Sequence, residues 1–511
     1  MPTPPTDPDL RAERFGVLDA DADPLGPGRL LVVPRGGGAA RVLTPPEAQV
    51  FAAIGTVGTL AELADACLRA LPPAVLAALA GREPADGARA GVEAALRSFV
   101  AGGLLAAEGA ALERLAAVPD APPPGITSVC IPTRDRLPVL LRALRGFADN
   151  DTAHGRATTF VVMDDSDDPR SGRRHRDALR ILAADSGRIL RHAPRGARER
   201  FARRLARRAG VAEATARFAL LGDGRFASSH GAARNALLLD TAGELSLFVD
   251  DDFVCRPGVP PGARQELALS PRGDGNEYWF GATGDAVQAL VSPAAVDFLE
   301  VHERMLGRSP AGCVARAREL GMPVRIADGW AVGTLMRGDA RVMNTFAGIV
   351  GDVGGPGRHH PRLQMRGESF DRLVSDGDGY AARLHSRHVL KSPVRFSLAP
   401  DSYCMAGNMG VDGRTLPPPF MPVQIAEDIV FGVCRRMLHP TACSGYLPFA
   451  IPHLPPGPRR SAEAPPPLTF ISNRVVSTAL ARATDVWPPG DAAAGFAAAG
   501  TYLRALGTAP G

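Results

Sequence analysis

Three apolar segments of the chain end in carboxylates, and this feature limits the fold more than any other. The segments are "TSVCIPTRDR", "TTFVVMDDSDDP" and "LSLFVDDD", and the first two are separated by the amphipathic helical pattern "LPVLLRALRGFADN". Strand, helix and strand at this spacing predict a βαβ unit with a parallel sheet. Ligands of open parallel sheets bind beyond the carboxyl ends of the strands. The acids expected at that rim are Asp135, Asp164, Asp165, Asp250, Asp251 and Asp252.

Length and composition predict a globular protein of two or three domains. The chain has 511 residues, 45% of them hydrophobic and 22% charged, with a net charge of +4. Two proline-rich stretches, "VPDAPPPG" and "PHLPPGPRRSAEAPPPL", divide it. We therefore expect a first domain over 1–118, a linker over 119–126, a catalytic domain over 127–460 and a C-terminal helical extension over 461–511.

The sequence contains no apolar run of about 18 residues or more, which predicts that the chain has no membrane span. Its start, "MPTPPTDPDLRAERFG", is expected to be a polar, flexible leader and not a signal peptide, so the prediction is a cytoplasmic protein. The seven cysteines are scattered without a CxxC pair. That spacing favours reduced, mostly buried thiols over a disulfide framework or a zinc site.

The basic residues are unevenly distributed. Between Arg188 and Arg208 nine arginines face one acid, Glu199. Such a cluster is able to neutralise nucleic-acid phosphates, but in a chain whose basic residues are almost all arginine a solvated helix face is the favoured interpretation. No nucleic-acid partner is expected.

The first region has the pattern of a small winged-helix-like α+β domain. "GRLLVVPR" and "ARVL" predict two short strands, and helices are expected to begin at Thr44-Pro45-Pro46, at Thr59 and near Gly91. This pattern, with "LTPPEAQVFAAI", "TLAELADACL" and "ALRSFVAGGLLA", resembles the PqqD-like domains, or RiPP recognition elements. The resemblance implies that the domain holds a precursor peptide as an added strand. A DNA-binding winged helix and a structural cap are the alternatives.

Clustered carboxylates at one sheet rim repel one another unless a cation compensates them. Hard divalent cations prefer oxygen ligands, so a Mg²⁺ or Mn²⁺ ion that bridges a diphosphate is the expected solution. A solvated acidic turn is the alternative, but it would not explain why three apolar strands each end in acids.

The order of these motifs resembles the GT-A fold glycosyltransferases, particularly the large family 2. The matching segments run from Thr127 to about His453 and are "SVCIPTRDR", "VVMDDSDD", "AARNALLLDTAGE", "FVDDDF" and "AGNMGVDGRTLPPPFMPVQIAEDIVFG". The resemblance implies an α/β fold with a mixed, mainly parallel sheet flanked by helices. It also implies a metal-dependent, inverting transfer of a sugar from a nucleotide-sugar donor. Together with the resemblance of the first domain, it implies a ribosomally made peptide as the acceptor.

The resemblance assigns roles to individual residues. It implies that Pro132, Asp135, Asp164 and Asp165 bind the donor nucleotide, with Asp250 contacting the ribose and the metal. Further metal ligands would be Asp252 and His453. His359, His360 and His439 are the alternatives to His453 in this role. The implied catalytic base is Asp428 or its neighbour Glu427. Asp135 stands where the family often has Asn, and Gly281–Ser402 shows no motif.

Two other functions are compatible with parts of this pattern. One is a peptide-binding scaffold whose transferase domain no longer turns over, against which the complete acidic motifs argue. The other is a nucleotidyltransferase on a similar sheet. Those enzymes usually have a glycine-rich phosphate loop after the first strand, and "IPTRDRLPV" has no glycine there.

Overall fold

The computed structural model describes most of the chain. The described residues are 12–17, 20–34, 39–80, 87–118, 120–226, 228–270, 276–327, 332–335, 338–353, 362–363, 365–457, 472–483 and 492–508. The first eleven residues of the expected leader, the candidates His359 and His360, and most of the second proline-rich stretch lie outside them. Among the described helices, none combines the length and the apolar character needed to cross a membrane.

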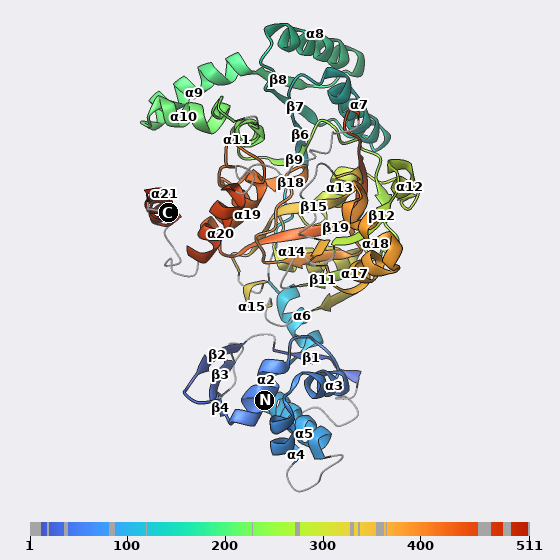
Figure 1. Ribbon diagram of the computed structural model, residues 1–511, viewed down its shortest axis with the longest axis vertical. Coiled ribbons are helices and arrows are strands. Elements are labelled where there is room, and N and C mark those ends of the chain that lie inside the picture. Colours follow the sequence, from blue (N-terminus) through green and yellow to red (C-terminus); the bar gives the residue numbers. More distant parts are fainter. Residues whose placement is uncertain are drawn as a thin grey trace.

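One 14-stranded sheet forms the centre of the molecule (Figure 1). Four of its strands, in the order β9-β6-β7-β8, pair in parallel. Their bounds are β6 Ile126–Thr133, β7 Thr159–Asp164, β8 Leu190–Pro194 and β9 Leu245–Val249. The expected βαβ unit is confirmed, because α7 (Leu137–Ala153) connects β6 to β7.

Both faces of this parallel part are covered by helices, since alternate strand residues point to opposite sides. Val129 and Ile131 of β6 pack with α7 and with α8 (Pro169–Ser186). Cys130, between them, packs with three helices on the other face. These are α9 Arg195–Ala209, α10 Glu213–Leu221 and α11 His230–Asp240. Strands buried on both faces explain why the sequence shows continuous apolar runs here.

The rest of the sheet is mixed. β18 (Asn408–Asp412) lies antiparallel between β9 and β15 (Arg341–Asp352), and β15 pairs in parallel with β19 (Ala442–His453). The other strands are β10 Gly258–Val259, β11 Leu267–Leu269, β12 Asn276–Gly281, β13 Ser292–Pro293, β14 Val324–Ile326, β16 His388–Pro393 and β17 Phe396–Ala399. Along the ten-strand path the parallel pairings predominate, which confirms the expected α/β class with a mixed, mainly parallel sheet.

Helices surround this second part. They are α12 Gly284–Gln288, α13 Phe298–Glu303, α14 Pro310–Glu319, α15 Val332–Leu335, α17 Gly367–Val374, α18 Gly377–His385 and α19 Glu427–Leu438. The C-terminal extension expected to be helical contains α20 (Ser472–Ala483) and α21 (Ala492–Thr508). Asn473 fixes α20 next to α19, because its amide donates to the carbonyl oxygens of Val423 and Ile425 at 3.0 and 3.1 Å.

The N-terminal unit has a hydrophobic core of its own, in which Phe51 and Phe99 meet edge to face at 5.7 Å. Two of its helices begin at capping boxes, Thr44 with Glu47 and Thr59 with Glu62, which explains their starting points. Its helices are α2 Pro45–Ala53, α3 Leu60–Ala70, α4 Pro73–Ala80 and α5 Gly87–Ala101. Its strands are β1 Phe15–Gly16, β2 Ala20–Pro24, β3 Leu30–Pro34, β4 Arg41–Leu43 and β5 Ala106–Ala107. The two expected strands are β3 and β4, and β2 joins them.

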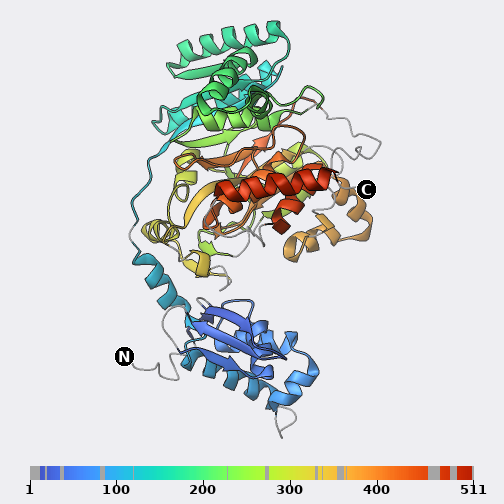
Figure 2. The same cartoon turned by 90° about the vertical axis from the view of Figure 1, so that its left-hand side faces the viewer.

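Helix α6 (Glu108–Ala116) connects this unit to the large sheet (Figures 1 and 2). One Glu108 carboxylate oxygen accepts from Arg14 Nε at 2.9 Å, and the other accepts from the backbone N–H of Ile326 at 2.6 Å. Glu113 also pairs with Arg318 of α14 at 2.7 Å. The joint is therefore a packed helix.

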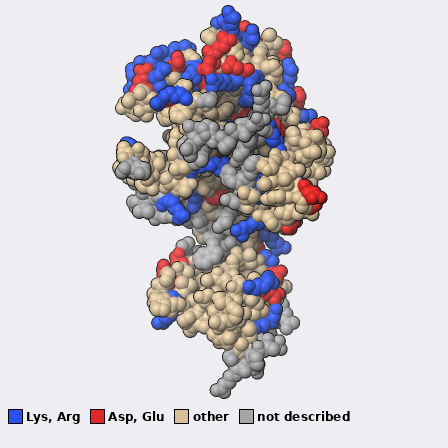
Figure 3. Space-filling view, in the orientation of Figure 1, with Lys and Arg blue, Asp and Glu red and all other residues tan. Residues whose placement is uncertain are grey.

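The arginine-rich segment forms β8 and α9 at one end of the molecule, where Figure 3 shows basic and acidic side chains mingled. Arg203, Arg204, Arg207 and Arg208 are exposed on α9. Arg198 points inward and is buried. All seven cysteines are buried free thiols, as the sequence predicted.

Candidate active site at the carboxyl ends of the parallel strands

The acid-tipped strands end at one rim, as the sequence predicted. Thr133, at the end of β6, lies opposite Asp164, at the end of β7. β9 lies on the other side of β6 and delivers Asp250, Asp251 and Asp252 next to them. Thr133 Oγ1 donates to Asp251 Oδ2 at 2.6 Å, which ties the first and third acidic turns together.

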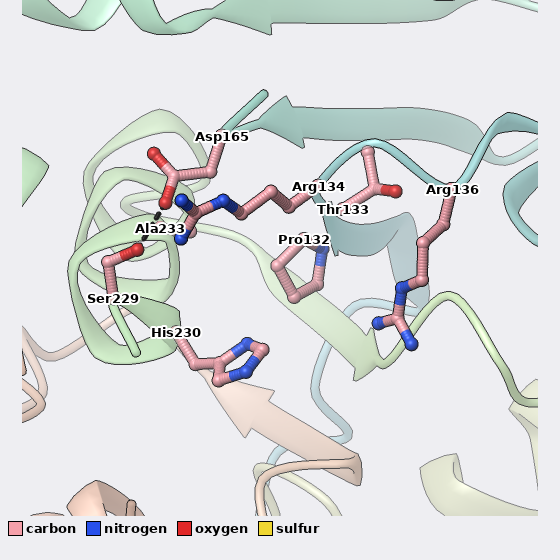
Figure 4. A pocket seen from close by; sticks show the side chains of 8 residues that line it. All are labelled: Pro132, Thr133, Arg134, Arg136, Asp165, Ser229, His230 and Ala233. Carbon is pink, nitrogen blue, oxygen red and sulfur yellow. Dashed lines mark hydrogen bonds between the residues drawn. The ribbon is translucent and has the colours of Figure 1, made fainter. Parts of the chain in front are cut away.

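A hollow opens at this rim (Figure 4). Its wall contains two of the predicted nucleotide-binding residues, Pro132 and Asp165, and three basic side chains that the sequence argument did not assign. The lining residues are Pro132, Thr133, Arg134, Arg136, Asp165, Ser229, His230 and Ala233. The Asp165 carboxylate accepts a hydrogen bond from Ser229, which joins β7 to the start of α11.

Asp165 is buried and held by two arginines. Arg195 Nη1 lies 3.0 Å from its carboxylate, and Arg198 donates to the same oxygen. Arg198 also donates to the carbonyl oxygens of Asp164 at 3.1 Å and Leu220 at 3.0 Å. Two arginines of the basic segment therefore hold the Asp165 carboxylate in place at the wall of the hollow.

Asp164 does not line the hollow. Its buried carboxylate accepts from His175 Nδ1 at 2.9 Å, from His192 Nε2 at 3.2 Å and from the backbone N–H of Ser166 at 2.9 Å. Burial raises the pKa of Asp164, but the hydrogen bonds from His175, His192 and Ser166 outweigh it and hold the pKa far below its usual range. Asp164 therefore stabilises the turn after β7 and is not exposed to the hollow.

Asp135 lies in the turn after β6 with φ of 54°, a left-handed conformation that Asp tolerates better than most residues. Its backbone N–H donates to Ser166 Oγ at 3.0 Å. The turns that follow β6 and β7 are thus bonded to each other.

The three consecutive acids are compensated by cations of the protein itself. Asp250 pairs with Arg234 of α11 at 2.6 Å. Arg136, at the start of α7, pairs with Asp251 at 2.5 Å and with Asp252 at 3.1 Å. A divalent cation is therefore not required to make this cluster stable, which the argument from repulsion alone did not foresee.

Burial shifts the protonation of this cluster. Asp251 is fully buried, and its desolvation raises its pKa to about 7 although Arg136 opposes the change. Burial lowers the pKa of His230, and the positive charges of Arg234 and Arg136 lower it further. The negative charge of Asp250 raises it in part.

His453 lies beside Asp252, with its Nε2 3.1 Å from Asp252 Oδ1. Its Nδ1 is bonded to the carbonyl oxygen of Asp352, and a carbonyl oxygen only accepts, so Nδ1 carries a proton. In neutral His453 the facing Nε2 and Oδ1 would then both be acceptors. A proton or a metal cation between them resolves this contact, and both atoms are ligand types for divalent metals.

Glu427 and Asp428 begin α19, after backbone with φ of 68° at both Gln424 and Ala426. Glu427 is buried and paired with Arg234, which joins it to Asp250. Burial raises the pKa of Glu427, and Arg234 opposes this. Asp428 is only half-buried, and its Oδ1 accepts from the N–H of Ile429 at 2.9 Å. The acid with more access to solvent is Asp428.

Close packing brings α11 and this segment together. A Cβ on Gly231 would lie 1.9 Å from the carbonyl oxygen of Met421, so only glycine fits there. Asn235 adds a pair of hydrogen bonds with the backbone of Phe420, at 2.7 and 3.0 Å. This contact sets the position of Arg234 between Asp250 and Glu427.

The sequence argument missed Arg136, Arg234 and His230. Arg136 follows β6 within the quoted "IPTRDR", so its place after an acid-tipped strand was an available signal. Arg234 lies within the quoted helix before β9, and His230 comes two residues before that segment. The partners of Arg136 and Arg234 lie 16 to 193 residues away along the chain, and no local pattern identifies such pairs. His439 lies elsewhere, with Nε2 3.4 Å from the carbonyl oxygen of Leu416.

Comparisons with known proteins give little further information. No protein-family model and no curated protein matches the chain. The crystal structure of GalNAc-T7 with UDP, GalNAc and Mn²⁺ matches at 9% identity and a TM-score of 0.29, over 74% of this chain and 54% of that one. The chain thus spans about half the length of that protein, and at this TM-score nothing about the site rests on the likeness.

The raised pKa of Asp251 predicts a pH-dependent stability. Between pH 3.8, its ordinary value, and about 7 the folded chain binds more protons at this carboxyl than the unfolded chain does. The free energy of unfolding of the wild type, relative to Asp251→Asn, should fall by about 1.4 kcal/mol per pH unit in this window. Denaturant unfolding in the presence of a chelator measures it. The exposed Asp177→Asn is the matched control, and a difference that does not change with pH would contradict the prediction.

Proposed function

We propose that the chain is a metal-dependent glycosyltransferase that moves a sugar from a nucleotide-sugar donor to an acceptor by an inverting reaction. The observation that carries the proposal is the rim itself. Acid-tipped parallel strands, a hollow with three basic side chains, and a His–Asp pair lie together where ligands of open sheets bind. Motif order in the sequence and topology in the fold support the same assignment.

In this proposal the donor nucleotide binds in the hollow. Pro132 and Asp165 contact the nucleoside, while Asp135 and Asp164 shape the two turns that hold it. Asp250 contacts the ribose. The diphosphate carries negative charge, and Arg134 and Arg136 line the same hollow and offset it. His230, whose pKa is lowered, offers a neutral N–H donor beside them.

Asp252 and His453 would hold Mn²⁺ or Mg²⁺, with Asp250 as a further ligand. Within the described residues no group of three acidic, histidine or cysteine side chains is already gathered for a metal. Such ions are usually held by one or two carboxylates and take most of their remaining ligands from substrate phosphates and water, so this small set of protein ligands fits them. When bound, the cation stabilises the charge that develops on the departing nucleoside diphosphate.

An inverting transfer needs a carboxylate that accepts the proton of the attacking hydroxyl. We assign this role to Asp428, since Glu427 is buried and neutralised by Arg234. Arg234 of α11 pairs with Asp250 after β9 and with Glu427 of α19, and these ion pairs fix the two helices relative to the strand. In this proposal they hold Asp428 in a constant position relative to the acids that bind the donor.

We further propose that the N-terminal unit recruits a peptide acceptor. Its three-stranded sheet has the order β2-β3-β4, so β2 and β4 are edges. On the β4 edge, Val42 is 41% exposed. An exposed edge strand accepts an added strand through backbone hydrogen bonds.

The metal assignment predicts a defect in donor binding. Asp252→Ala should abolish the part of the thermal stabilisation by nucleoside diphosphates that depends on Mn²⁺, because a ligand that binds only the folded state raises the melting temperature. The measurement is a melting series over several nucleoside diphosphates with Mn²⁺ or with a chelator. Asp177→Ala, at an exposed position, should behave as the wild type. Equal Mn²⁺ dependence in Asp252→Ala would remove the metal role.

The base assignment predicts a loss of turnover without a loss of binding. Asp428→Asn keeps the size of the side chain but accepts no proton, so the turnover number should fall about 100-fold or more while the donor still binds. Initial rates with a nucleotide sugar measure it. A larger loss in Glu427→Gln would assign the base to Glu427. Normal turnover in both variants would place the chemistry elsewhere.

Peptide recruitment predicts a change in KM. A shortened chain that begins at Gly103 keeps α6 on α14, and it should show a raised KM for a peptide encoded beside the enzyme. Its kcat for nucleotide-sugar hydrolysis should stay constant, because recruitment does not touch the donor chemistry. Unchanged peptide kinetics in a folded shortened chain would leave the unit as a structural cap. Peptide binding without any turnover by the full chain would favour the scaffold alternative.

A further inference from the structure

Lys391 is the single lysine among the 58 basic Lys and Arg residues of the chain. It lies on β16, and its Nζ donates to the Tyr403 hydroxyl at 2.8 Å. The same Nζ lies 5.2 Å from the ring centre of Tyr403 and 5.8 Å from that of Tyr278. The ammonium group is thus bonded to the hydroxyl edge of Tyr403 and lies near the Tyr278 ring at the outer limit of cation–π distance.

Tyr403 is fixed in place by its surroundings. Its ring meets Phe346 edge to face at 5.1 Å and packs on Tyr446 at 5.6 Å. Asp401 anchors the preceding backbone, because it accepts from Tyr403 N–H at 3.3 Å and from the hydroxyl of Tyr446 at 2.5 Å. The phenol hydroxyl therefore has a preset position, which lowers the entropy cost of binding a ligand there.

The segment that follows Tyr403 leads directly to the acidic rim. Tyr403, Met405 and Gly407 are partly exposed, whereas the residues between them are buried. The carbonyl oxygen of Gly407 accepts the backbone N–H of Asp250 at 3.0 Å. A Cβ on Gly407 would lie 3.1 Å from Asp250 Oδ2, and four residues of chain span at most about 14 Å, which bounds the distance from Tyr403 to the acidic rim.

Electrostatics places the proposed base near the same tyrosine. Burial raises the pKa of Tyr403, the positive charge of Lys391 lowers it, and the negative charge of Asp428 raises it. Asp428 is therefore close enough to influence the phenol. The packing of α19 agrees: a Cβ on Gly432, one turn after Asp428, would lie 2.0 Å from the carbonyl oxygen of Ser402 and 3.3 Å from Cys404 Cβ. The first turns of α19 therefore lie against the segment that carries Tyr403.

The chemistry of the pair suits an oxyanion. A lysine ammonium is a compact charge with three donors, and a phenol adds a further donor at a fixed place. The guanidinium used at the chain's other basic positions is a planar fork, which differs in shape and in its hydrogen-bond directions. A carboxylate or phosphate oxygen would accept from both Nζ and the hydroxyl.

We propose that Lys391 and Tyr403 form an acceptor subsite that binds a carboxylate or phosphate carried by the acceptor near the hydroxyl that Asp428 deprotonates. The assignment of this anion to the acceptor rests on the proposed function. The binding of an anion at Lys391 does not, and it is measured separately.

Labelling with [¹³C,¹⁵N]lysine gives a single lysine spin system, so side-chain NMR of the full chain reports Lys391 alone. Three probes share one ring: glucuronate, glucose 6-phosphate and glucose. At constant ionic strength, glucuronate or glucose 6-phosphate should shift the Lys391 side-chain signals saturably, and glucose should not. Comparison of the two anions tells whether a carboxylate or a phosphate is preferred. In Tyr403→Phe the apparent Kd should rise about 10-fold, the usual effect of losing one hydrogen bond to a charged group.

Several results would overturn the proposal. They are the absence of a Lys391 shift with both anions, an equal shift with glucose, and an unchanged Kd in Tyr403→Phe. Binding of nucleoside diphosphates to the wild type is scored in the separate melting series. If no nucleotide binds while the anions still shift Lys391, the glycosyltransferase proposal fails and the anion site stands. If nucleotides bind and Lys391 does not respond, the reverse holds.

Discussion

The pairing of three consecutive carboxylates with Arg136, Arg234 and His453 is the interaction on which the rest of the site depends. Two of these acids are almost fully buried, and uncompensated buried charges cost several kcal/mol each. Each partner comes from a different element: Arg136 from the start of α7, Arg234 from α11 and His453 from the end of β19. Charge neutralisation at the end of β9 therefore also fixes the relative positions of the elements around it.

The far side of the rim is stiffened by another buried cation. Arg435 of α19 is fully buried and donates to Asn344 Oδ1 at 2.8 Å, to Ser444 Oγ at 2.9 Å and to the carbonyl oxygen of Asp401 at 2.5 Å. These bonds connect α19, β15, β19 and the loop before β18. A helix that presents an acid at its first turn is thus anchored by an arginine two turns later, which keeps the rim preorganised for binding.

The sequence predicted the parts of this protein that depend on local pattern. Apolar runs that end in acids identified β6, β7 and β9 and the rim they share, since strand direction and the period of the side chains determine both. It did not predict that Asp164 faces two histidines behind the sheet, or that Arg234 bridges Asp250 and Glu427, because these pairs form between distant segments. Long-range pairing also explains the silent segment from Gly281 to Ser402. Its strands β15 and β16 take their places from partners such as β19 and β12, and not from a motif.

The carboxylate of Glu108 makes the connection between the two bodies of the molecule a clamp. One oxygen is bonded to Arg14 of the N-terminal unit and the other to the backbone of β14, the edge strand of the large sheet. A rotation of either body about α6 would strip a buried carboxylate of its donors, which is costly. The unit is therefore carried at a set orientation. A ligand of this unit is therefore presented to the large sheet in a defined direction, which a flexible linker between the two bodies would not provide.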